Sequence, residues 1–83
     1  MQYKKQLIRF IDDVHIRYYN IEICPTLFGE ILLERVYGNI RYKHPTRIIK
    51  NYFEDMRIAQ KLFNKTLNEK IKKGYVERFE TWM

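Results

Sequence analysis

The chain has 83 residues, of which 46% are hydrophobic and 31% charged, with a formal net charge of +6. A chain this short buries only about 60–65% of its unfolded surface, which excludes a second lobe and leaves one modest core. The composition excludes a disordered chain, and its longest apolar run, residues 31–33, excludes a membrane-spanning segment. We expect a single cytoplasmic domain over residues 1–83, with a core at about 7–75 and a tail at 76–83.

Alternating segments predict strands in the first two thirds of the chain. Residues 17–23 alternate with period two, which places Tyr19, Ile21 and Ile23 on one face of a half-buried strand. By similar criteria, with turn-forming residues between the runs, we expect strands at residues 7–11, 17–23, 30–37 and 46–53.

The connection at residues 24–29 contains Pro25 and Gly29. Proline removes a donor from the strand ladder and glycine permits a positive φ, so a turn is expected here. Because Leu27 and Phe28 are large and apolar, we expect both side chains to point inward.

The period changes from two to about 3.6 after residue 55, which predicts one amphipathic helix over residues 56–73. Asp55 is a suitable N-cap, and Gly74 is a suitable stop. The apolar stripe consists of Met56, Ala59, Leu62, Phe63, Leu67 and Ile71. The fold class is therefore α+β: a small antiparallel sheet of about four strands with one long C-terminal helix packed on it.

No arrangement of side chains indicates catalysis or a metal site. The chain has no serine, Cys24 is its only cysteine, and His15 and His44 lie in separate turns. The adjacent pair Asp12 and Asp13 is typical of a turn rather than a cation site. We expect no enzyme, no cofactor, no metal and no small-molecule substrate.

The clearest indication of function is the acid-free segment 35–53. Cations together with tyrosine rings are the residue types that bind phosphates and stack on bases. The alternative is that these cations are simply the solvated face of a sheet. The segment contains Arg35, Tyr37, Arg41, Tyr42, Lys43, Arg47, Lys50 and Tyr52.

Several motifs resemble those of the WGR domain family over residues 17–75. They are residues 17–19, the turn at 25–29, residues 35–40 and, in the helix and after it, Ala59, Phe63, Lys70, Gly74 and Tyr75. This family is a DNA-associated module of poly(ADP-ribose) polymerases and of small stand-alone bacterial proteins. The resemblance implies an antiparallel sheet with one C-terminal helix, and recognition of DNA backbone at ends or breaks.

The tripeptide that names the family is altered here, because Tyr37-Gly38-Asn39 stands in place of Trp-Gly-Arg. In the family, the tryptophan lies against a nucleotide and the arginine grips the backbone. Tyr37 retains a smaller ring, whereas Asn39 hydrogen-bonds without a charge. Arg41 or Lys43 is a candidate replacement for the missing cation.

The main hypothesis is a non-enzymatic DNA-binding module with little sequence preference, since phosphate contacts carry no base code. Its candidate binding residues are Tyr37, Asn39, Arg41, Lys43, Arg47 and Arg17. The alternative is a protein-interaction module that keeps the scaffold and docks a partner chain or a second copy of itself through an exposed sheet edge.

Overall fold

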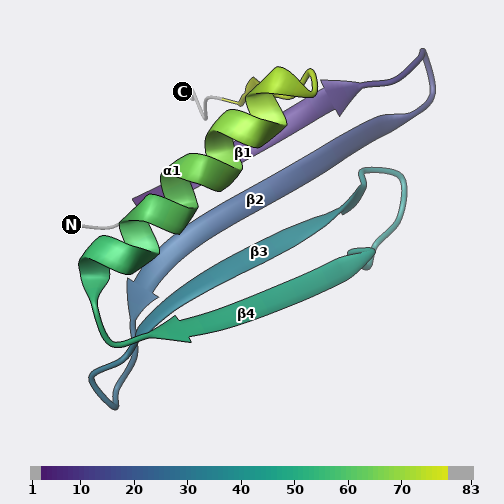
Figure 1. Cartoon of the computed structure of the whole chain (residues 1–83). Coiled ribbons are helices and arrows are strands. Elements are labelled where there is room, and N and C mark those ends of the chain that lie inside the picture. Colours follow the sequence, from purple (N-terminus) through teal and green to yellow (C-terminus); the bar gives the residue numbers. More distant parts are fainter. Residues whose placement is uncertain (1–2, 79–83) are drawn as a thin grey trace, which may run out of the picture.

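The computed structural model describes residues 3–78, which form an antiparallel sheet with one helix across a single face (Figure 1). The described strands are β1 (Tyr3–Phe10), β2 (Ile16–Pro25), β3 (Ile31–Asn39), β4 (Arg47–Phe53) and the two-residue β5 (Val76–Glu77), and the helix is α1 (Met56–Lys72). The strand order is β4-β3-β2-β1-β5. The predicted α+β class is confirmed, with β5 as an additional edge strand.

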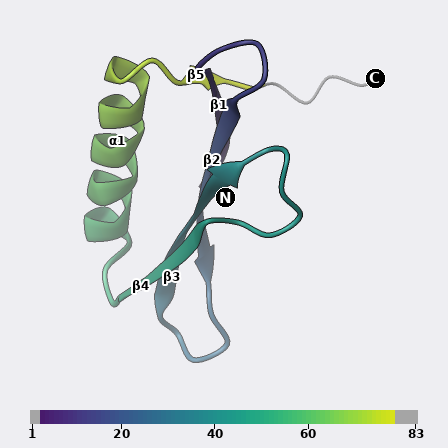
Figure 2. The same ribbon diagram turned by 90° about the vertical axis from the view of Figure 1, so that its right-hand side faces the viewer.

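Side chains on the helix face of the sheet form the core, as the alternation in β2 predicts. Tyr19, Ile21 and Ile23 are each no more than 3% exposed, and their cross-strand neighbours Leu7 and Leu33 are fully buried. Ala59 and Phe63 complete the core from α1. In Figure 2 the helix lies to one side of the sheet, and no helix or strand among residues 3–78 covers the opposite side, which we call the open face.

The ends of α1 follow the sequence signals. The Asp55 carboxylate accepts a hydrogen bond from the Arg57 amide at 2.8 Å, and Gly74 has a φ of +107°, in the left-handed region that favours glycine. The buried face of α1 differs from the predicted stripe at its C-terminal end. Ile71, which was predicted to be buried, is 48% exposed, whereas Thr66, which was not predicted, is buried.

The predicted inward packing of the hairpin between β2 and β3 is wrong. Leu27 is 99% exposed and Phe28 is 89% exposed, so both side chains are in solvent at the hairpin tip. The turn itself is conventional, since the Thr26 hydroxyl accepts the Phe28 amide and Gly29 has a φ of +83°. Figure 1 shows the reason: the hairpin extends beyond the end of the sheet that α1 covers.

Gly38 lies inside β3 rather than ending it, and the loop at residues 40–46 folds closely against its backbone. The Thr46 amide donates a hydrogen bond to the Tyr37 carbonyl at 2.8 Å. A Cβ atom on Gly38 would lie 2.8 Å from that amide nitrogen and 3.2 Å from Pro45 Cα. Only glycine therefore allows the loop to approach this closely.

Replacing Gly38 with alanine should lower the free energy of unfolding by about 1–3 kcal/mol, because the loop backbone must move to admit the methyl group. Denaturant unfolding measures the change, and the NMR shift of the Thr46 amide reports the displacement. Gly29→Ala is the comparison, since its Cβ meets nothing within 4 Å and costs only backbone strain. An unmoved Thr46 resonance in Gly38→Ala would contradict this explanation.

Candidate nucleic-acid interface

A hollow of about 240 Å³ lies on the helix face, at the end of the sheet where β2 begins and β3 ends. Three rings, those of Tyr37, Tyr42 and Tyr75, contribute to its wall together with the side chain of Arg17. We call it the tyrosine hollow. Its lining residues are Arg17, Tyr37, Gly38, Asn39, Tyr42, Thr46 and Tyr75.

Tyr37 is half-buried. One face of its ring stacks on the buried Tyr19 ring, with centroids 5.4 Å apart and planes 10° from parallel. The pair forms because the two residues are direct cross-strand neighbours. Tyr75 packs edge-on against Tyr19, 6.1 Å away. The Tyr19 ring thus contacts two of the three tyrosines that line the hollow, Tyr37 and Tyr75.

Lys70 holds a positive charge beside these rings. Its Nζ atom lies 4.6 Å from the centroid of Tyr19 and 5.9 Å from that of Tyr75, within the range of cation–π attraction. Burial lowers the pKa of Lys70, and the nearby cations Lys73 and Arg35 act in the same direction. An anion close to the ammonium group would favour its charged form and raise this pKa again.

Arg35 supplies a second cation under the helix. One of its terminal nitrogens donates to Asn51 Oδ1 at 2.8 Å, while its Nε is the one buried side-chain nitrogen or oxygen without a hydrogen-bond partner among residues 3–78. Burial raises the pKa of the neighbouring Tyr19 hydroxyl, and the positive charge of Arg35 acts in the opposite direction. The interior beside the hollow therefore carries a positive charge, and one hydrogen-bond donor of that charged group has no partner there.

Four of the six predicted binding residues gather at the tyrosine hollow. Arg17, Tyr37 and Asn39 line it, and Arg47 is exposed directly opposite Tyr37 on β4. Because β-strand side chains alternate between faces, these four residues share the helix face.

The remaining two, Arg41 and Lys43, are exposed on the loop at residues 40–46. This loop begins at the same end of the sheet but bends away from α1 (Figure 2). The six residues therefore surround the end of the sheet instead of sharing a single surface.

Two other residues of the basic segment lie on the open face. Lys50 pairs there with Glu34 at 3.8 Å, and Tyr52 is 54% exposed. Strand alternation separates them from Tyr37 and Arg47. The segment is continuous in sequence, but the fold divides it between two faces.

Asn39 has a structural part in the turn that follows β3. Its Oδ1 accepts the Arg41 amide at 2.9 Å, and its carbonyl accepts the Tyr42 amide at 3.1 Å. Directly opposite it on β2 is Arg17, which is followed across the ladder by Arg9 on β1. Two arginines, Arg17 and Arg9, thus lie in a row beside Asn39, the position at which the family tripeptide has an arginine.

Near this end of the sheet, the carboxylate of Asp12 is held by local hydrogen bonds. The Asp12 carboxylate accepts hydrogen bonds from the backbone amides of Val14 and His15 and contacts the His15 ring at 2.8 Å. These bonds, first that of Val14, lower the pKa of Asp12. The pair stabilises the β1–β2 turn.

Sequence reasoning missed Lys70 and Tyr75 as members of the site. Lys70 follows Phe63 by seven residues and Leu67 by three, so its spacing places it on the buried stripe of α1. The sequence signal for Lys70 was therefore a cation at a position of the helix where apolar residues are expected. The parts played by Arg35 and the buried Tyr19 could be recognised only once the cross-strand register was known.

Features of other site types are sparse in the described part of the chain. No group of three or more His, Cys, Asp or Glu residues among residues 3–78 is arranged to hold a metal ion. Burial, with Glu22 and Glu34 nearby, raises the pKa of Cys24, the opposite of an activated thiol. No helix in the same region is both long and apolar enough to span a membrane.

Comparison with known proteins identifies the family to which the chain belongs. No curated protein and no solved structure matches the chain. The family model described as the WGR domain matches residues 4–81, nearly the whole chain. WGR domains are in general a nucleic-acid-binding type of domain. This chain belongs to the WGR domain family.

Proposed function

We propose that this chain is a DNA-binding module without catalytic activity, which takes the sugar-phosphate backbone of a DNA end against the tyrosine hollow. The observation that carries the proposal is the arrangement of Lys70, Arg17 and Arg47 around the stacked rings of Tyr19 and Tyr37. Rings receive a sugar or base, and cations receive phosphates.

We assign to Arg17 the role that the arginine of the family tripeptide has, since Asn39 stands in that position here. It is the direct cross-strand neighbour of Asn39, and residues in that relation have Cβ atoms about 4.5–5.5 Å apart. An arginine on β2 can thus present its guanidinium at the place where the family presents one from β3. The earlier candidates Arg41 and Lys43 fit less well here, because neither lines the hollow and their loop bends away from α1 (Figure 2).

Arg41 and Lys43 are suited to a different part of the DNA. Their loop borders the hollow through Tyr42 and Thr46, so a strand leaving the hollow passes beside it. Contacts of this kind add affinity without sequence preference. Phosphate neutralisation by Arg17, Arg47, Lys70 and one loop cation gives about four contacts.

A protein-interaction role is the second candidate, and one observation favours it. Leu27 and Phe28 present almost their whole side chains to solvent at the β2–β3 hairpin tip. Exposed apolar pairs of this kind are typical of contact with another protein. Absence of DNA binding in the experiments below would leave this role as the better supported one.

Salt dependence of DNA binding tests the phosphate contacts. With about four phosphates neutralised, the logarithmic salt slope should be about −3.6, so affinity should fall roughly 150-fold between 50 and 200 mM salt. Arg17→Ala should reduce that slope by about one. Fluorescence anisotropy with blunt and nicked duplexes measures both.

Lys61→Ala is the matched control for the salt experiment. Lys61 is an exposed cation in the N-terminal half of α1, away from the tyrosine hollow. Its removal changes the net charge as Arg17→Ala does, but it should leave the slope unaltered. Equal effects from the two variants would show that only overall charge matters and would remove the site from consideration.

Replacing Tyr37 by leucine tests the stacking role. Leucine keeps apolar bulk against Tyr19 but removes the ring, which should weaken DNA binding by about 1–3 kcal/mol with little change in salt slope. Tyr52→Leu alters an exposed tyrosine on the open face and should bind as wild type does. Circular dichroism confirms that both variants are folded. Unchanged affinity in Tyr37→Leu would contradict the stacking role.

A further inference from the structure

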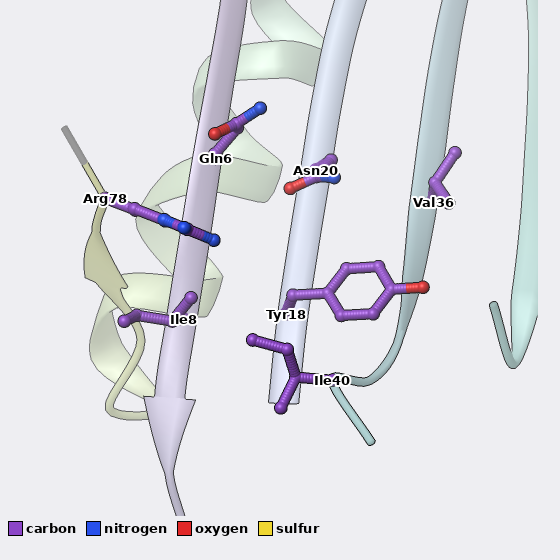
Figure 3. A pocket seen from close by; sticks show the side chains of 7 residues that line it. All are labelled: Gln6, Ile8, Tyr18, Asn20, Val36, Ile40 and Arg78. Carbon is purple, nitrogen blue, oxygen red and sulfur yellow. The ribbon is translucent and has the colours of Figure 1, made fainter. Parts of the chain in front are cut away.

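The open face of the sheet contains a second hollow, of about 310 Å³ (Figure 3). Ile8, Tyr18 and Val36 form an apolar wall from three adjacent strands, and Ile40, which is 48% exposed, closes one end. No helix or strand among residues 3–78 covers this hollow. Residues 79–83, the rest of the expected tail, lie outside the described part of the chain.

The tip of the β2–β3 hairpin has an apolar pair of matching chemistry. Leu27 and Phe28 are 99% and 89% exposed, and their hairpin extends beyond the end of the sheet (Figure 1). An apolar cavity of about 150 Å³ accommodates a benzene ring. A hollow of about 310 Å³ therefore has room for the Phe28 ring and the Leu27 side chain together.

The tip does not reach the hollow of its own chain. It joins β2 and β3 at one end of the sheet, whereas Ile40 follows the other end of β3. Strand β3 has nine residues, and a strand rises about 3.3 Å per residue, so its two ends lie about 26 Å apart. A hairpin tip that fills the hollow therefore comes from a second copy of the chain.

The charges around the tip and around the hollow are opposite in sign. Residues 18–34, which include the hairpin, contain three glutamates and no lysine or arginine, and Glu30 is exposed beside the tip. Arg78 lines the hollow, and Arg41 and Lys43 are exposed on the loop that follows Ile40 and bends away from α1 (Figure 2). Opposite charges favour contact between a tip and a hollow, whereas like charges disfavour contact between two tips or between two hollows.

We propose that this chain associates head to tail, with Leu27 and Phe28 of one copy seated in the open-face hollow of the next and Glu30 facing its cations. The contact joins two different surfaces and is therefore heterologous. Its area is small, which makes the association weak and dependent on protein concentration. The proposal is independent of DNA binding, because no residue that lines the tyrosine hollow takes part in the contact.

Two variants that each remove one surface test this proposal. Phe28→Asp places a charge at the tip and Ile40→Asp places one in the hollow, and both positions are exposed and outside the core. Each variant alone should be monomeric in sedimentation velocity at a concentration at which the wild type associates. A mixture of the two should form a dimer, because Ile40→Asp retains its tip and Phe28→Asp retains its hollow.

NMR locates the contact in the same mixture. Unlabelled Phe28→Asp protein should shift the Gly29 amide of ¹⁵N-labelled Ile40→Asp protein, because the tip of the labelled copy is the bound surface. With the labels exchanged, the amides of Ile8 and Tyr18 should shift instead, since these residues line the hollow. No DNA is present, so the result stands apart from the test of DNA binding.

Ile71→Asp is the matched control, because Ile71 has the same 48% exposure as Ile40 but lies on α1. It should associate as the wild type does, and circular dichroism confirms that all three variants are folded. A wild-type protein that stays monomeric at millimolar concentration would overturn the proposal. So would a mixture that forms no more dimer than either variant alone, or an equal loss of association in Ile71→Asp.

Discussion

The stack of Tyr19 on Tyr37 is the contact on which the proposed interface depends. Tyr19 is 3% exposed and belongs to the core, so its ring is held by β2 and by the helix above it. Tyr37, Tyr75 and Lys70 each take their position from that ring. The core and the proposed binding surface are therefore one packing unit, and under the proposed function a change to Tyr19 would alter stability and DNA binding together.

Much of the fold was predictable because its two periods are distinct. Alternation identified the buried face of β2, and spacing of three and four residues identified α1 with its Asp55 cap. Strand β5 has only two residues, which is too few for a period. The exposure of Leu27 and Phe28 was not predictable from hydrophobicity, because it depends on how far the hairpin extends beyond α1.

The candidate site was only partly predictable, for a geometric reason. Residue types near Tyr37 indicated nucleic-acid chemistry, but the cations nearest in sequence, Arg41 and Lys43, lie on a loop that bends away. The cation that faces Asn39 is Arg17, which is 22 positions earlier and adjacent only through the register of β2 and β3. The composition of the segment therefore indicated nucleic-acid binding, whereas only the pairing of β2 with β3 showed which cation lies beside Asn39.

The partial enclosure of Lys70 has a consequence for how the interface behaves in different media. Dissolved ions weaken the fields of charges that they can surround, and they reach exposed arginines far more readily than an ammonium group covered by aromatic rings. In the proposed site, the attraction of Lys70 for a phosphate should consequently persist in concentrated electrolyte, where that of Arg41 fades. In such a medium the proposed interface would retain a short-range anchor after long-range steering is lost.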